Sequence, residues 1–133
     1  MMTLANWSVL AACLLPILSA GIAKSGGIGR SRSKGGYDNS NPREWLSKQS
    51  GFQQRANAAQ ANGFEALPLF IAAVVLAQQA QGPQHMIDTL AMAFVAIRVI
   101  YLVTYLKDWA TVRSLVWTAG LGVSIAILLQ SAR

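Results

Sequence analysis

Long apolar stretches separated by polar segments dominate the chain. The first runs from Leu4 to Ala23 without a charged residue, and a helix of about twenty residues crosses the roughly 30 Å hydrocarbon core of a bilayer. Three further apolar stretches follow the first long polar segment. The pattern predicts an all-α fold, an integral membrane bundle of four helices over about residues 4–23, 53–80, 87–106 and 114–130, in a single domain of residues 1–133.

A cleaved signal peptide is the alternative for the first stretch. The three residues before it carry no Lys or Arg, and its apolar part is longer than the roughly 7–15 residues of a signal peptide. Both features favour a retained helix, which Pro16 is expected to bend.

A polar connection of about thirty residues, from Lys24 to Phe52, separates the first two helices. Its first part, residues 25–36, consists mainly of Gly, Ser and basic residues and is expected to be mobile. Pro42 suits the first position of a short helix, whose Trp45 and Leu46 are predicted to lie at the level of the lipid headgroups.

Lys and Arg are distributed unevenly among the three connections. The second connection holds none, while the first and third hold nine: Lys24, Arg30, Arg32, Lys34, Arg43, Lys48, Arg55, Lys107 and Arg113. Because basic residues favour the cytoplasmic side, the long first loop and the third loop are predicted to be cytoplasmic. Both termini are then on the non-cytoplasmic side.

Composition limits the possible partners. The chain is 53% hydrophobic and 12% charged, which excludes an ordinary soluble domain. The net charge of +6 does not indicate nucleic acid, because the basic residues do not alternate with aromatic residues along one face. A single cysteine, Cys13, and a single histidine, His85, predict neither an intrachain disulfide nor a metal site.

Two ionisable side chains, Glu65 and Arg98, lie inside predicted spans. Such groups are costly in lipid and indicate function by default. Helical spacing of about 100° per residue places each of them in a polar stripe: Arg55, Asn62 and Glu65 on the second helix, and Arg98, Tyr101 and Tyr105 on the third. If the stripes face each other they form a polar pocket, with Arg113 at its mouth. A buried ion pair between Glu65 and Arg98 is the structural alternative.

Small residues recur at every fourth position of the last span. They are Ser114, Thr118, Gly122 and Ala126. This spacing predicts close packing of that face against another helix, and Gly120 and Ser124 add a neighbouring stripe.

Three segments carry a resemblance to a known family. RANAAQANGFEALPLF from Arg55 to Phe70, RVIYLVTYL from Arg98 to Leu106, and VRS at residues 112–114 resemble the MAPEG family, the membrane-associated proteins in eicosanoid and glutathione metabolism. The resemblance covers nearly the whole chain in length, span count and loop placement. YDNSNPR at residues 37–43 is similar to the bacterial branch, which implies a bacterial inner membrane.

The resemblance implies a homotrimer with glutathione sites between subunits, open to the cytoplasm. By position, the glutathione-binding residues are Arg55, Gln60, Asn62, Glu65, Arg98, Tyr101 and Tyr105. Arg113 would favour the thiolate of glutathione, and Tyr105 or Ser114 would donate a hydrogen bond to the thiolate or the developing product. The thiolate would attack a hydrophobic electrophile from the bilayer. The implied activity is that of a membrane-bound glutathione transferase or a peroxidase-like enzyme.

Two other functions stay open. A non-catalytic protein of the same fold would bind membrane lipid or serve as a scaffold. A small multidrug transporter would use Glu65 as its proton-coupled carboxylate, although such transporters usually carry a glutamate in the first helix, which here has no charge.

Overall fold

The computed structural model describes residues 1–132. Its helices are α1 (Leu4–Lys24), the short α2 (Pro42–Ser47), α3 (Gly51–Gln79), α4 (Gln84–Leu106) and α5 (Ala110–Leu129), with 3-10 turns at Ser25–Gly27, Arg32–Lys34 and Gln130–Ala132. Four of these helices, α1, α3, α4 and α5, are long and apolar enough to cross a membrane. The predicted four-span, all-helical fold is therefore confirmed.

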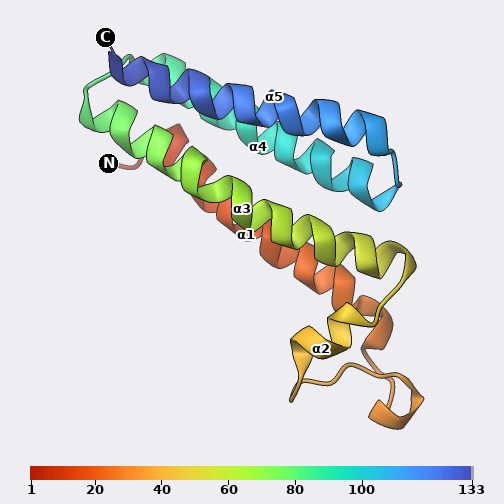
Figure 1. The fold of residues 1–133 in the computed structure, drawn as a ribbon. Coiled ribbons are helices and arrows are strands. Elements are labelled where there is room, and N and C mark those ends of the chain that lie inside the picture. The colour runs from red at the N-terminus through yellow and green to blue at the C-terminus, as the bar shows by residue number, and fades with distance from the viewer. Residues whose placement is uncertain (133) are drawn as a thin grey trace.

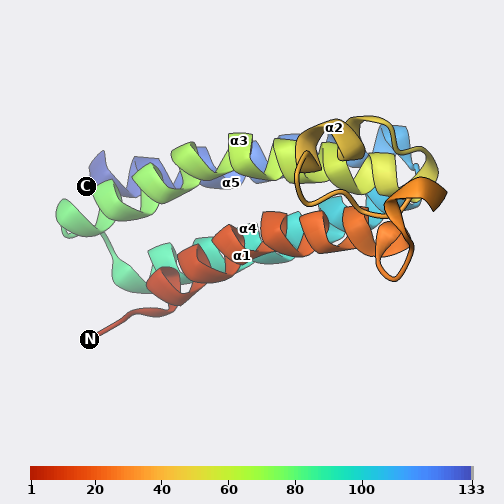
Figure 2. The same ribbon diagram turned by 90° about the horizontal axis from the view of Figure 1, so that it is seen from below.

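The four long helices form one bundle (Figures 1 and 2). α1 packs against α3 and α4, and α5 packs against the same two helices. The beginning of α1 and the end of α5 lie at one end of the bundle, together with the α3–α4 connection. The long loop with α2 and the turn between α4 and α5 lie at the other end (Figure 1). The end of the bundle with the chain termini is called the termini end, and the end with the long loop is called the loop end.

The core lies where α3 and α4 meet. Phe70 and Phe94 stack with ring centroids 4.0 Å apart, and both side chains are almost fully buried. Two turns earlier on the same face of α3, Gly63 faces Pro16 of α1, and a Cβ atom at Gly63 would lie 2.8 Å from Pro16 Cγ. This position needs glycine because the two helices approach so closely.

The turn between α4 and α5 is shorter than predicted, so α5 begins at Ala110 and not at residue 114. Asp108 adopts a positive φ of 59°, and the N–H of Trp109 donates to the carbonyl of Thr104 at 2.9 Å. This is a Schellman helix end, built on an aspartate where glycine is usual. Arg113, placed in a loop by the sequence pattern, is therefore in the first turns of α5.

The stripe of small residues that begins at Ser114 does not pack against another helix of the same chain. Within the chain this stripe is largely exposed, and a Cβ atom at Gly122 would have no neighbour within 4 Å. The neighbouring pair, Gly120 and Ser124, is buried instead. A Cβ atom at Gly120 would lie 3.4 Å from Ile97 of α4. Spacing alone could not choose between two adjacent stripes.

The long loop packs against the ends of α1 and α3. Trp45 and Leu46, predicted to lie at the headgroup level, are buried in a small cluster with Ala23 and Ala56. The indole N–H of Trp45 donates to the carbonyl of Gly35 at 3.3 Å. The short helix α2 therefore anchors the glycine-rich first part of the loop to the bundle.

Candidate functional site

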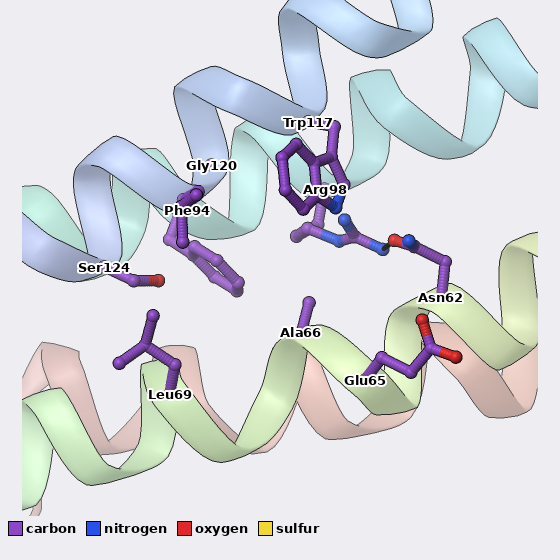
Figure 3. Close-up of a pocket in the computed structure, with 10 residues that line it drawn as sticks. Asn62, Glu65, Ala66, Leu69, Phe94, Arg98, Trp117, Gly120 and Ser124 are labelled. Atoms are coloured by element: carbon purple, nitrogen blue, oxygen red, sulfur yellow. Dashed lines mark hydrogen bonds between the residues drawn. The ribbon is translucent and has the colours of Figure 1, made fainter.

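Glu65 and Arg98 line the same cavity, which lies between α3, α4 and α5 (Figure 3). Its volume is about 250 Å³. The wall is polar where Asn62, Glu65 and Arg98 meet. The remainder is mainly apolar and is formed by Ala66, Leu69, Phe94, Trp117, Gly120, Leu121 and Ser124. The cavity thus offers charged groups at one end and an apolar surface along its length.

Arg98 is the buried cation of this cavity, with only 8% of its surface exposed. Its Nη2 donates to Asn62 Oδ1 at 3.0 Å, a bond drawn in Figure 3 that joins α4 to α3. The guanidinium also lies 4.1 Å from the ring centroid of Tyr101. A guanidinium has five N–H donors, so one hydrogen bond within the chain leaves most of its donors for a ligand.

Glu65 is exposed and lies at the polar end of the cavity beside Asn62 (Figure 3). In residues 1–132 its carboxylate forms no ion pair with Arg98 or with any other basic side chain. The structural alternative of a buried Glu65–Arg98 pair is therefore not what the chain forms. The two opposite charges share one cavity and do not neutralise each other.

A second, more open cavity of about 450 Å³ adjoins the first at Asn62 and Trp117. Arg113, Ser114 and Tyr101 also line it. It leads from the buried polar groups toward the start of α5, at the loop end of the bundle. A ligand longer than the first cavity has room to extend into the second.

The four side chains Arg98, Tyr101, Tyr105 and Arg113 follow one another through direct contacts. Arg98 lies against Tyr101, and the rings of Tyr101 and Tyr105 pack edge to face with centroids 5.7 Å apart. The guanidinium of Arg113 lies 4.3 Å from the Tyr105 ring centroid. Cation–π contacts of this kind hold a guanidinium in place while its N–H groups stay free at the edge. The series connects the predicted binding residues to the predicted catalytic arginine.

Two of the predicted residues make other contacts. Arg55 Nε donates to the carbonyl of Leu106 at 3.2 Å, near the end of α4. Ser114 Oγ donates to the carbonyl of Ala110 at 3.2 Å, so its proton is used within α5. Neither bond prevents the rest of the side chain from meeting a ligand.

Gln60 lies on a different side of α3 from the cavity. Helical spacing puts it about 160° from Asn62 and about 60° from Gly63, which faces α1. Its Oε1 is buried and has no hydrogen-bond partner in the described part of the chain. A single chain therefore does not bring Gln60 to the cleft.

Comparison with models of protein families shows which family the chain belongs to. The model of the MAPEG family matches residues 4–133. The chain belongs to the MAPEG family. Comparison with curated proteins and with solved structures gives no match. MAPEG membership makes the chain an integral membrane protein of a family connected with eicosanoid and glutathione metabolism.

The MAPEG motif residues named from the sequence do not include the aromatic wall of the cleft. Trp117 lines both cavities, and its position one helical turn after Arg113 is the signal from which it could have been found. In this MAPEG chain no group of three or more His, Cys, Asp or Glu residues within 1–132 is arranged to hold a metal ion.

Proposed function

We propose that the chain is a membrane-bound glutathione transferase or peroxidase-like enzyme that binds glutathione in the cleft between α3, α4 and α5. The observation that supports this best is that Glu65 and Arg98 line one cavity without forming an ion pair. Leaving the buried guanidinium of Arg98 without an ion pair, and a carboxylate unpaired on a spanning helix, is costly. A ligand that carries both charges compensates for that cost.

Glutathione has the matching groups, since it carries two carboxylates, one ammonium group and one thiol. The Glu65 carboxylate is suited to the ammonium group. The free donors of Arg98 are suited to a carboxylate, which guanidinium groups often bind through two parallel hydrogen bonds. Asn62 accepts from Arg98 and so orients the guanidinium. Tyr101 supports it from the other side.

Arg113 is placed to act on the thiol. A free thiol has a pKa near 8.5 and a nearby cation lowers it, so more of the bound glutathione is thiolate at neutral pH. The thiol proton leaves to water, and the thiolate then forms a bond to an electrophilic carbon while the leaving group departs with its electron pair. The ring of Tyr105 packs against Arg113, and its hydroxyl is suited to donate a hydrogen bond to the sulfur. The exposed Ser114 is a second candidate donor, although its proton is now bonded within α5.

The second substrate is proposed to be hydrophobic and to come from the bilayer. The cavity wall formed by Leu69, Trp117 and Leu121 is apolar, and such a wall discriminates weakly among apolar molecules. It therefore suits lipid-like or xenobiotic electrophiles as a class.

The proposed assembly is a homotrimer in a bacterial inner membrane, with the long loop on the cytoplasmic side and both termini on the other. Because Gln60 lies away from the cleft of its own chain, Gln60 and Arg55 would assist the glutathione site of a neighbouring subunit in this trimer.

A thiolate difference spectrum tests the proposal. Purified protein saturated with glutathione is expected to show the ultraviolet absorbance of a thiolate at neutral pH, and to conjugate glutathione to a chlorinated nitrobenzene. Arg113→Ala should lose most of both signals, because the cation beside the sulfur is gone. Arg32→Ala, a change in the exposed loop, is the matched control and should retain both.

The alternative outcomes are distinguishable. Glutathione binding without any thiolate in the wild type would indicate the non-catalytic member of the fold, whose role is lipid binding or scaffolding. Absence of binding at millimolar glutathione would remove the proposed function. Resistance to quaternary cations that disappears in Glu65→Gln would favour the transporter.

A further inference from the structure

Three basic side chains of the long loop have no partner within the described chain. Arg30, Lys34 and Arg43 are exposed, and none of them makes a side-chain hydrogen bond or ion pair with another residue in 1–132. These three residues are called the basic loop surface. Its charge is available to a partner outside the chain.

The acidic residues of the loop do not offset this charge, because each is already paired. Arg32 Nε lies 3.4 Å from Asp38 Oδ1, and Lys48 Nζ lies 2.9 Å from Glu44 Oε1. Asp38 and Glu44 are the only acidic residues between α1 and α3. The loop therefore divides its basic residues into an internally paired set and a free set.

The backbone that carries the basic loop surface is folded. The N–H groups of Lys34 and Gly36 both donate to the carbonyl of Ser31 at 2.9 Å. Between Lys34 and Gly36, the carbonyl of Gly35 accepts a hydrogen bond from the indole N–H of Trp45. Because this backbone is already folded, binding a partner does not incur the entropic cost of ordering it.

The position of the surface indicates which partner it meets. It belongs to the loop end, where Ile28, Phe52 and Trp109 are exposed at 71%, 46% and 51%. Lys107 Nζ lies 5.2 Å from the Trp109 ring centroid. Exposed aromatic and apolar side chains beside basic ones at the ends of spanning helices mark the membrane interface. The basic loop surface is thus next to the headgroup layer.

We propose that the basic loop surface binds the phosphate headgroups of anionic phospholipids in the adjacent leaflet. Arginine recognises phosphate through paired hydrogen bonds, and basic residues at the surface of an anionic leaflet are attracted to it. A lipid is favoured over a soluble polyanion because the bilayer holds headgroups at this level permanently. The interaction ties the loop, and with it the ends of α1 and α3, to the bilayer surface.

Native mass spectrometry of the full chain in a neutral detergent, titrated with phosphatidylglycerol or phosphatidylcholine, tests the proposal. The wild type is expected to bind phosphatidylglycerol with clear preference. Arg30→Gln combined with Arg43→Gln should raise the phosphatidylglycerol dissociation constant roughly tenfold. The matched control combines Arg32→Gln with Lys48→Gln, which removes the same charge from paired residues and should change the constant by about threefold or less.

Thermal unfolding of each variant shows that it remains folded, as expected for exposed positions. Equal losses in the two double variants would contradict the proposal, because net charge and not the free surface would then control binding. Equal binding of the two lipids by the wild type would also contradict it. Complete displacement of the lipid by a short oligonucleotide would identify the surface as a general polyanion site and overturn the lipid assignment.

Discussion

The two ends of the bundle both carry polar side chains between apolar helices, but they use them differently. At the termini end, most polar groups satisfy one another, although the buried Oε1 of Gln130 has no partner in the described residues. Gln78 Nε2 donates to Thr3 Oγ1 at 2.9 Å and its Oε1 accepts from Asn6 at 3.1 Å. Asp88 Oδ1 accepts from the backbone N–H of Ala5 at 2.8 Å. These bonds join α1, α3 and α4 and use most of the hydrogen-bonding capacity there.

Toward the loop end, the polar side chains leave hydrogen-bond donors and acceptors unused. Arg98 makes a single hydrogen bond, to Asn62, and Glu65 makes none among the described residues. Arg98 is a buried cation that uses one of its five N–H donors, so its position beside a cavity indicates a ligand. The comparison teaches that polar residues inside a membrane bundle are structural where they bond one another and functional where their donors and acceptors remain free.

The largest expected effect is at the cleft. Arg98→Gln should weaken glutathione binding roughly tenfold to a hundredfold, because it removes charge-assisted hydrogen bonds to the ligand. The free energy of unfolding should change little, since a buried charge is lost along with its one bond. Calorimetric titration and unfolding in mixed detergent micelles measure the two quantities, and Arg32→Gln is the control. A large loss of stability with unchanged affinity would make Arg98 a structural residue.

The termini end should show the opposite result. Gln78→Ala removes one hydrogen bond from each of Thr3 and Asn6 and is expected to lower the free energy of unfolding by about 1–2 kcal/mol. Glutathione affinity should stay the same. Gln79→Ala is the matched control, because Gln79 is exposed on the same helix and makes no side-chain bond in the described chain. A fall in affinity for Gln78→Ala would mean that the two ends are coupled.

A smaller loss of unfolding free energy is expected for a change between the two ends, at the contact of α1 with α3. Gly63→Ala places a Cβ atom 2.8 Å from Pro16 Cγ, so the helices must separate slightly, at a cost of about 1 kcal/mol. Gly122→Ala meets no atom within 4 Å and should be neutral or stabilising, since alanine favours helix. Equal stabilities of the two variants, measured by unfolding in mixed micelles, would show that the contact is not tight.

The smallest effect concerns pH at the loop. The backbone amide of Ser40, more than the guanidinium of Arg32, lowers the pKa of Asp38 from its ordinary value. The unfolded chain therefore binds more protons at this position, and the stabilisation is present above the unfolded pKa and is lost as pH falls through the folded pKa. An NMR titration of the Asp38 carboxyl group should show the lowered value. A normal value would mean that the turn around Ser40 does not form.

The sequence predicted the spans well because lipid requires long apolar helices, and that requirement is visible in hydropathy. It placed the start of α5 too late because the preceding helix end uses Asp108 with a positive φ, where the usual glycine signal is absent. The burial of Trp45 was not predicted because it depends on Ala23 and Ala56, which are distant in sequence.

For the site, the polar stripes predicted that Glu65 and Arg98 would share a cavity, and they do. The pattern did not predict that Asn62, and not Glu65, bonds Arg98, because that choice depends on how α3 and α4 are displaced along each other. Trp117 was missed because its one signal, a position one helical turn after Arg113, is weak for an aromatic residue in an apolar span. The roles of these residues toward glutathione remain proposals.

The central claim is that Glu65 and Arg98 hold one ligand between them. Calorimetric titration of the wild type and of Glu65→Gln, each with glutathione and with an analogue that lacks the ammonium group, tests it directly. The wild type is expected to bind glutathione roughly tenfold more tightly than the analogue, and Glu65→Gln is expected to bind both equally. The same preference in both proteins, or no binding by the wild type at millimolar glutathione, would contradict it.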